Sequence, residues 1–380
     1  ILMASFFENL PKFFSGFSKK QASIAAIDFG GSSVKVIQMR KERGRIILET
    51  YGEVATGPYA GLAVGQAASL SPDRMAALLV DLFKESNITA QVGAMAIPLR
   101  SSLLLTIEIP DLGSSIRLEQ VIPIEARKYI PVPITEVALD WWVIPKGRGE
   151  RDVSPEIDSK NEKLIENNLE VLIAAVHRDL LKQYQDLGPK LNLNLNFFEI
   201  ETFSTIRSVL KNDLAPKVIL DLGATATKMT IVDYGVIRLS HTISKGGQDV
   251  TMAIARSLSV PFAKAEEIKR KVGLSDRLGG EEIIGTVSPT VDYIFSEVNR
   301  IMLEYEKKHK RAIDKVILVG AASALQGLPE IASKHLSVPI ARGNPFAKVE
   351  APAFLEPTLA EAGPSFAPAI GLALRQLQDL

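Results

Sequence analysis

Two short segments of the chain carry the same chemical groups at the same spacing. Each has a carboxylate, a glycine two residues later, a hydroxyl four residues later and a lysine seven residues later. The groups are Asp28, Gly30, Ser32 and Lys35 in the first segment and Asp221, Gly223, Thr225 and Lys228 in the second. Turns of this composition present backbone N–H groups and hydroxyls at close range, which suits a phosphate. The lysines could act as point charges on a β- or γ-phosphate, and the two aspartates could hold Mg²⁺ mainly through its waters.

Each segment alone also fits an ordinary β-hairpin with an Asp-Gly-type turn. The pair changes this interpretation, because an apolar run precedes each turn, at residues 24–27 and 218–220, and strand-like sequence follows it. A repeat at about 190 residues is too long for a solenoid and fits a duplicated α/β unit whose halves face each other. A cleft between such halves could close on both sides of one triphosphate. The pair therefore favours nucleotide binding.

Two further groups of residues could complete a nucleotide site. Gly320 ends an apolar strand and precedes Ala321 and Ser323, which would let a purine approach the backbone at a helix N-terminus. Glu266 and Lys269 are three residues apart on one face of a predicted helix and could hydrogen-bond ribose hydroxyls. Taken alone, such a pair is usually a solvated pair on a helix surface.

The elements that must position these residues follow from hydrophobic periodicity and proline content. We predict helices at 72–85, 246–258, 264–272, 291–308 and 369–377, and strands at 93–97, 103–109, 137–144, 169–176 and 316–319. Prolines bound short elements in the stretch from 110 to 146, and 146–168 reads as a charged surface loop.

These elements divide the chain into four parts. They are an N-terminal amphipathic segment (1–21), a first half (22–97, completed by 192–215 and 350–380), an inserted α+β domain (98–191) and a second half (216–349) with a helical subdomain at about 246–310. The N-terminal segment carries an aromatic helical face that could lie in a membrane interface or pack on the protein or a partner. Pro11 weakens that helix unless it opens one.

Composition excludes several classes of function. The 380 residues contain 46% hydrophobic residues, and 44 basic residues balance 44 acidic ones, so no net field favours nucleic acid or an anionic membrane. The absence of cysteine removes disulfides and thiol nucleophiles, and the four histidines are too scattered for a metal site. No apolar run is long enough to cross a bilayer, and no P-loop motif is present.

Several motifs resemble those of the actin-like ATPase superfamily. Residues 26–35 (AIDFGGSSVK) and 220–228 (LDLGATATK) resemble its two phosphate motifs, and 317–323 (ILVGAAS) resembles its adenosine motif. Within the superfamily, residues 125–133 (EARKYIPVP) are similar to the E-A-x-x-Y-I-P-x-P signature in the inserted domain of the PilM proteins of type IV pilus assembly. Residues 244–249 (SKGGQD) and 265–269 are similar to the ribose-side segment of that family, and the FtsA cell-division proteins come next.

The resemblance implies an α/β actin-like ATPase fold, with duplicated mixed-sheet subdomains facing a nucleotide cleft and a small inserted α+β domain. It adds Gly31, Ser33, Ala224, Gly246 and Gly247 to the residues expected to bind ATP and Mg²⁺. It also makes Glu201 the candidate that orients water for slow ATP hydrolysis, the alternative being an ordinary helix-end glutamate.

In functional terms, the resemblance implies an ATP-binding adaptor at the cytoplasmic face of the inner membrane, in a type IV pilus or a related secretion or competence system. Its partners would be the N-terminal tail of a PilN-like membrane protein, bound by a preformed groove, and other platform proteins. Peripheral membrane association and a homo-oligomer are both compatible with it. One alternative is an FtsA-like filament-forming ATPase, disfavoured because residues 371–380 have little aromatic or basic character, and the other is a small-molecule kinase of the same fold.

Overall fold

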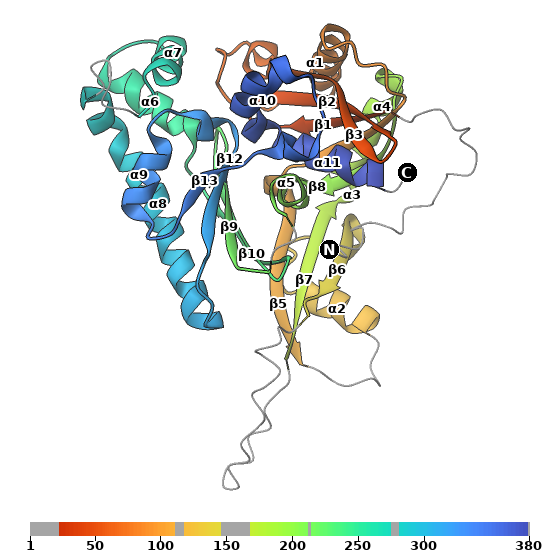
Figure 1. The fold of residues 1–380 in the computed structure, drawn as a ribbon. Coiled ribbons are helices and arrows are strands. Elements are labelled where there is room, and N and C mark those ends of the chain that lie inside the picture. Colours follow the sequence, from red (N-terminus) through yellow and green to blue (C-terminus); the bar gives the residue numbers. More distant parts are fainter. Residues whose placement is uncertain (1–22, 111–117, 146–167, 212–213, 275–280, 379–380) are drawn as a thin grey trace.

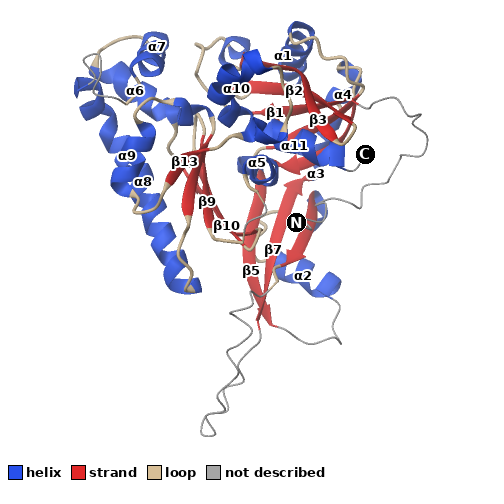
Figure 2. Cartoon of the chain, viewed as in Figure 1, coloured by secondary structure: helices blue, strands red, loops and turns tan. Residues whose placement is uncertain are grey.

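The computed structural model describes residues 23–110, 118–145, 168–211, 214–274 and 281–378. The predictions for the N-terminal segment 1–21 and for most of the loop at 146–168 lie outside these residues. Figure 1 shows three parts: the second half of the chain on the left, the first half at the upper right, and a three-stranded module below the first half. Figure 2 shows that helices cover the outer faces of the two large sheets.

The first half is built on a five-stranded sheet with the order β3-β2-β1-β4-β8. Its strands are β1 (Ser23–Phe29), β2 (Ser33–Glu42), β3 (Arg45–Ala55), β4 (Val92–Ile97) and β8 (Asn194–Ile200). The first three strands pair antiparallel, and β4 and β8 join in parallel. Its helices are α1 (Pro72–Glu85), α3 (Arg178–Gln185), α4 (Leu187–Lys190), α5 (Glu201–Val209), α10 (Glu356–Ala362) and α11 (Ala367–Gln378), with short 3₁₀ turns such as η1 (Gly57–Ala60).

The second half repeats this topology in a second five-stranded sheet, ordered β11-β10-β9-β12-β13. Its strands are β9 (Lys217–Leu222), β10 (Thr227–Asp233), β11 (Val236–Ile243), β12 (Lys315–Val319) and β13 (Ile340–Arg342). Again three antiparallel strands come first and two parallel strands follow. Its helices are α6 (Gly247–Ser257), α7 (Phe262–Val272), α8 (Glu281–His309) and α9 (Leu328–His335).

The inserted module has a three-stranded antiparallel sheet ordered β5-β7-β6. Its elements are β5 (Ser102–Pro110), α2 (Leu118–Ala126), β6 (Val137–Val143) and β7 (Asn168–His177). Although the module is inserted in the first half, it also contacts the second half. Arg238 of β11 donates to Glu170 at 2.6 Å, and the Thr106 hydroxyl donates to the Arg238 carbonyl at 3.2 Å. We call this contact the module seam.

The predicted strands and most predicted helices are confirmed to within one or two residues, and the largest error concerns α8. Its start was predicted at residue 291, whereas the helix begins at Glu281. Pro289 lies inside α8, where proline removes one helical hydrogen bond. The periodic apolar residues of α8 pack into the core of the second half, and this packing outweighs the local penalty.

Both faces of the first sheet are covered, which explains the continuous apolar sequence of its central strand β1. Alternate β1 residues enter two different cores, because side chains alternate across a strand: Ile27 packs in the core that contains α1, and Ile24 packs in the core that contains α11. Helix α11 crosses α5 closely, since a side chain at Gly371 would collide with the Ser204 carbonyl. This crossing joins the two halves, because α5 also packs against the second sheet.

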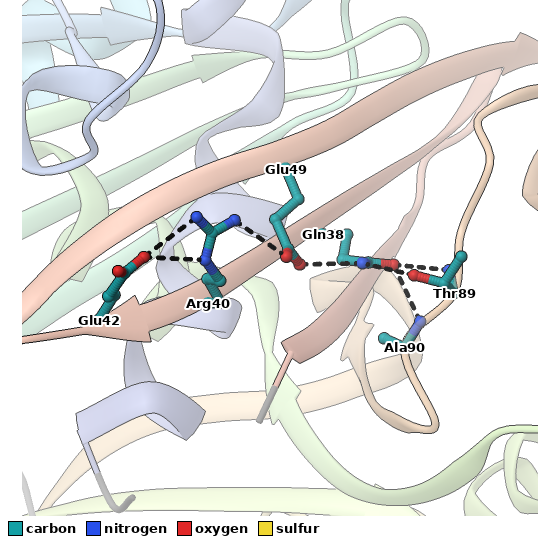
Figure 3. Close-up of polar contacts among 6 residues, drawn as sticks. All are labelled: Gln38, Arg40, Glu42, Glu49, Thr89 and Ala90. Atoms are coloured by element: carbon teal, nitrogen blue, oxygen red, sulfur yellow. Dashed lines mark hydrogen bonds and ion pairs between the residues drawn. The ribbon is translucent and has the colours of Figure 1, made fainter. Parts of the chain in front are cut away.

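A fully satisfied polar network holds the turn before β4 against β2 (Figure 3). The buried Gln38 amide donates to Glu49 at 2.9 Å and to the Thr89 hydroxyl at 3.0 Å, while its oxygen accepts the N–H groups of Thr89 (2.8 Å) and Ala90 (3.0 Å). Arg40 extends the network from the other side of Glu49. Because a buried amide is costly when unpaired, this network fixes where β4 begins.

Candidate functional site

The turns that follow Asp28 and Asp221 each have a glycine two residues after the aspartate, and we call them the Asp-Gly turns. The two turns match in the features described next. Asp28 is the register partner of Lys35 across β1 and β2, and Asp221 is the register partner of Lys228 across β9 and β10. In each turn, a Cβ added to the glycine would lie 2.8 Å from the carbonyl oxygen three residues later. The predicted strand–turn–strand repeat is therefore confirmed at the level of individual residue pairs.

The two turns face each other and present backbone donors. A Cβ added to Gly31 would lie 3.5 Å from the Thr225 hydroxyl, so only the space of about one methyl group separates the turns at this point. Within the described parts of the chain, the N–H groups of Gly31, Ser32, Ala224 and Thr225 make no hydrogen bond to protein atoms. Convergent N–H donors with neighbouring hydroxyls are the chemistry that phosphate oxygens accept, so this donor set fits a phosphate chain.

Beside the second turn, Lys228 bridges two carboxylates. Its ammonium lies 3.0 Å from an Asp221 oxygen and 2.8 Å from a Glu201 oxygen. Burial disfavours the ammonium, but attraction to Asp221 and Glu201 wins and raises the pKa of Lys228 above its ordinary value. Glu201 opens α5, and its other oxygen accepts the Leu99 N–H at 2.6 Å. Both oxygens of the predicted catalytic glutamate are thus already engaged.

Beside the first turn, Lys35 has different partners. It donates to the Ser33 hydroxyl at 2.7 Å and lies 3.2 Å from a carboxylate oxygen of Glu53, its cross-strand neighbour on β3. Asp28 is 6% exposed. Burial raises the pKa of Asp28 to about 7, with Lys35 lowering it and Glu201 raising it. Glu53 was not predicted, although the strand alternation of residues 45–55 would have placed it on the face of Lys35.

The adenosine-motif residues lie next to the second turn. Gly320 has φ +83°, and a side chain there would collide with Asp221 and come within 2.6 Å of the Leu222 carbonyl, so only glycine fits. The helix N-terminus predicted after Gly320 is wrong in one respect. Residues Ala321–Ala324 form a 3₁₀ turn, held by the buried Ser323 hydroxyl donating to the Gly320 carbonyl at 2.7 Å, and α9 begins only at Leu328. Small residues at such a turn leave the backbone as the surface that a ligand would meet.

Glu266 and Lys269 form a buried pair and not a solvated one. Their charged atoms are 2.6 Å apart, and Lys269 also donates to the Gly247 carbonyl at 3.1 Å and to the Thr251 hydroxyl at 2.9 Å. These three acceptors match the three N–H donors of the ammonium. Burial lowers the pKa of Lys269 despite the Glu266 charge. The pair braces α7 on α6, and a ribose contact from Lys269 would have to replace one of these bonds.

The start of α6 supports the second turn from behind. A Cβ on Gly246 would lie 2.6 Å from the Ala224 carbonyl, and the Gly247 N–H donates to the Gly223 carbonyl at 2.9 Å. The Gln248 N–H donates to the Ala224 carbonyl at 2.8 Å. The predicted glycine pair therefore lets a helix end dock directly on the turn.

A segment that sequence reasoning missed runs between the halves beside both turns. We call residues 57–70 the crossing segment. Its Ala68 N–H donates to the Gly31 carbonyl at 3.1 Å, and its Ala67 N–H donates to the Gln248 side-chain oxygen at 2.7 Å. Its many glycines and alanines were the available signal, but they carry no hydrophobic period that could place it.

The metal prediction rests on Asp28 and Asp221 alone. Across the described residues, no group of three or more His, Asp and Glu side chains is arranged to hold a metal ion. The two aspartates sit at equivalent ends of β1 and β9, which suits binding through metal-bound waters.

No helix in the described parts of the chain is long and apolar enough to span a membrane.

Comparison with solved structures assigns this two-lobed architecture to the actin-like ATPase fold. The solved PilM-PilN type IV pilus biogenesis complex matches with TM-score 0.75 at 23% identity, covering 95% of this chain and 99% of that one. Ethanolamine utilization protein EutJ from Carboxydothermus hydrogenoformans matches with TM-score 0.52 at 14% identity, over 93% of this chain and 90% of that one. MreB5 of Spiroplasma citri bound to AMPPNP matches with TM-score 0.50 at 12% identity, over 95% and 98%.

The family is defined more closely by sequence. Residues 26–377 match the family described as type IV pilus assembly protein PilM. The chain belongs to this family, as the motifs at residues 26–35, 220–228 and 125–133 predicted.

Proposed function

We propose that the protein is an ATP-binding adaptor of a type IV pilus assembly platform, with the triphosphate held between the two Asp-Gly turns. The observation that carries this proposal is the pair of turns in identical register, facing each other with N–H groups that no described protein atom accepts. Duplicated donors on opposite walls can hold a phosphate chain from both sides. The actin-like fold supports the same assignment.

In this proposal, the N–H groups of Gly31, Ser32, Ala224 and Thr225 and the Ser33 hydroxyl bind phosphate oxygens. Lys35 and Lys228 supply positive charge, and Asp28 and Asp221 hold Mg²⁺ through its waters. The ion would offset the phosphate charge. Gly320, Ala321 and Ser323 border the adenosine, with Gly246 and Gly247 on the ribose side and the Glu266–Lys269 pair behind them. These roles form one set because each depends on the same bound nucleotide.

Glu201 is the residue we assign to water positioning, and its contacts favour slow turnover. Both of its oxygens are held, one by Lys228 and one by the Leu99 N–H. A carboxylate must break one of its existing hydrogen bonds before it can accept one from the attacking water, so it orients that water poorly. The protein would therefore bind ATP for long periods and hydrolyse it slowly.

Calorimetric titration of ATP with Mg²⁺ tests the proposed pocket. We expect Asp28→Ala and Lys35→Ala each to weaken ATP binding by roughly tenfold or more, since charged contacts contribute about 1.5–3 kcal/mol. Asp73→Ala is the matched control, because Asp73 is an exposed aspartate at the start of α1. Unchanged affinity in both pocket variants would contradict the assignment.

The partner in this proposal is the N-terminal tail of a PilN-like membrane protein, which would hold the adaptor at the cytoplasmic face of the inner membrane. Family membership supports it, and so does the match at TM-score 0.75 to a PilM that was solved in complex with PilN. The inserted module offers exposed apolar side chains that a peptide could cover, Ile124 (59% exposed) and Tyr129 (48% exposed).

A titration with a labelled tail peptide from the cognate PilN-like protein tests this partner. We expect Tyr129→Ala to weaken binding about fivefold or more, because exposed aromatic residues dominate such contacts. Tyr293→Ala is the control, since Tyr293 is similarly exposed (52%) but lies on α8 of the second half. Equal effects of the two substitutions would remove the inserted module as the docking site.

A further inference from the structure

The crossing segment is organised by its own hydrogen bonds. The Leu62 N–H donates to the Gly57 carbonyl at 2.9 Å, and the Gln66 N–H donates to the Ala63 carbonyl at 3.1 Å. The Gln66 side chain in turn accepts the Ala63 N–H at 2.8 Å. The segment thus has a defined shape, and its contact with the second half is a docking contact between two formed elements.

Among the described residues, that docking contact includes a hydrogen bond and a close packing contact. The Ala67 N–H donates to the Gln248 side-chain oxygen at 2.7 Å, across the two halves. Nearby, Gly65 has φ +89°, and a Cβ there would lie 2.9 Å from the Glu266 side chain. The backbone at Gly65 therefore lies directly on Glu266, whose pair with Lys269 we place behind the ribose-side glycines.

Gln248 also connects the two turns. Its own N–H donates to the Ala224 carbonyl in the second turn at 2.8 Å, and its side chain holds Ala67. The next residue, Ala68, donates to the Gly31 carbonyl in the first turn at 3.1 Å. A short chain of hydrogen bonds thus runs from one turn to the other through a single glutamine.

We propose that Gln248 is a positioning residue that latches the crossing segment across the paired turns and thereby slows release of the bound nucleotide. This inference rests on the proposed nucleotide site. It adds a residue that touches no predicted ligand group and controls how the halves close around the ligand.

The latch and the ligand should support each other. A nucleotide between the turns would hold the two halves at the spacing at which Ala67 reaches Gln248, and by linkage the latched state would hold the nucleotide more tightly. A single hydrogen bond contributes about 0.5–1.5 kcal/mol, which corresponds to about a twofold to twelvefold change in a rate or equilibrium constant. Since the bond must break before the halves separate, we expect the effect mainly on dissociation.

Amide hydrogen exchange in the nucleotide-free protein tests the latch itself. We expect the Ala67 amide to be protected in the wild type and to exchange about threefold to tenfold faster in Gln248→Ala. Gln248→Glu should restore protection, because a carboxylate accepts the same hydrogen bond. Met252→Ala is the control, since Met252 lies one turn further along α6, is 37% exposed, and should leave Ala67 unchanged. An unprotected Ala67 amide in the wild type would overturn the proposal.

Dissociation of a fluorescent ATP analogue, followed by stopped-flow chase with excess ATP, tests the consequence for the site. We expect release to be about threefold to tenfold faster in Gln248→Ala and near wild type in Met252→Ala, with association changed less than about twofold. Binding with unchanged release in Gln248→Ala would overturn the latch alone. Failure of the wild type to bind the analogue would instead overturn the proposed function, and the effect of the latch on release with it.

Discussion

The two Asp-Gly turns share a register but their lysines have different partners. Lys35 pairs with Glu53, a 43%-exposed carboxylate on the neighbouring strand of its own half. Lys228 pairs with Asp221 and with Glu201, whose side chains are 15% and 7% exposed, and Glu201 belongs to α5 of the other half. The two copies of the repeat thus share the turn geometry, which local hydrogen bonds fix. The ion-pair partners of the two lysines differ, because a different element packs beside each turn. Lys35 pairs within its own sheet, whereas Lys228 pairs with a residue of the other half.

The largest difference between the turns should appear when each lysine is removed. We expect Lys228→Ala to lower the free energy of unfolding by about 3 kcal/mol, because two poorly exposed carboxylates would lose their counter-charge. Lys35→Ala should cost only about 1 kcal/mol, since Glu53 is accessible to water. Urea denaturation of both variants measures the comparison, and equal losses would show that the two lysines have equivalent surroundings.

The pH dependence of stability sharpens the comparison at the first turn. The Asp28 carboxyl has a pKa of about 7 in the folded protein, raised by burial above its ordinary value of 3.8. A raised pKa means that the folded state favours the protonated acid, so the stabilisation is present below about pH 4 and is lost as the pH rises through 7. Asp28→Asn should therefore be more stable than the wild type at pH 8, by about 2–4 kcal/mol, with the difference vanishing near pH 4.

Thermal unfolding between pH 4 and pH 8 provides that measurement. Asp73→Asn at the exposed start of α1 serves as the control and should follow the wild-type curve. Parallel curves for Asp28→Asn and the wild type would mean that Asp28 is ionised throughout this range.

The smallest difference between the turns should appear when the glycine of each turn is replaced by alanine. A Cβ on Gly30 or Gly223 would lie at the same 2.8 Å from a backbone oxygen, so Gly30→Ala and Gly223→Ala should each cost about 1.5 kcal/mol. Gly285→Ala, at an open position of α8, should be neutral or slightly stabilising. Chemical denaturation of the three variants decides this, and clearly unequal costs at the two turns would break the structural equivalence.

Sequence reasoning succeeded where the relevant geometry is local. Asp28 and Lys35 are seven residues apart in one hairpin, and so are Asp221 and Lys228, so equal turns give both pairs the same register. The duplicated α/β organisation followed from the repeat of this unit, and the actin-like fold and the family followed from the resemblance of motifs in and near it. These inferences needed no knowledge of how distant segments pack.

The parts that could not be predicted depend on contacts between distant segments. Gln248 meets Ala67 across 181 residues of chain, and Leu99 meets Glu201 across 102. Neither pair has a sequence period or a charge pattern that would indicate it. Lys269 is a third example. Its spacing from Glu266 could be read from the sequence, but its burial against acceptors of α6 could not be predicted.

The module seam has a mechanical consequence. The inserted module belongs to the first half by chain connection, yet Arg238 of the second half holds it through Glu170 and Thr106. Any hinge motion that widened the cleft would have to either rupture these bonds or swing the module along with the second half. In the proposed complex, a peptide bound to the module would then meet a changed binding surface whenever the halves moved. Motion at the nucleotide site would reach the peptide site through the module itself.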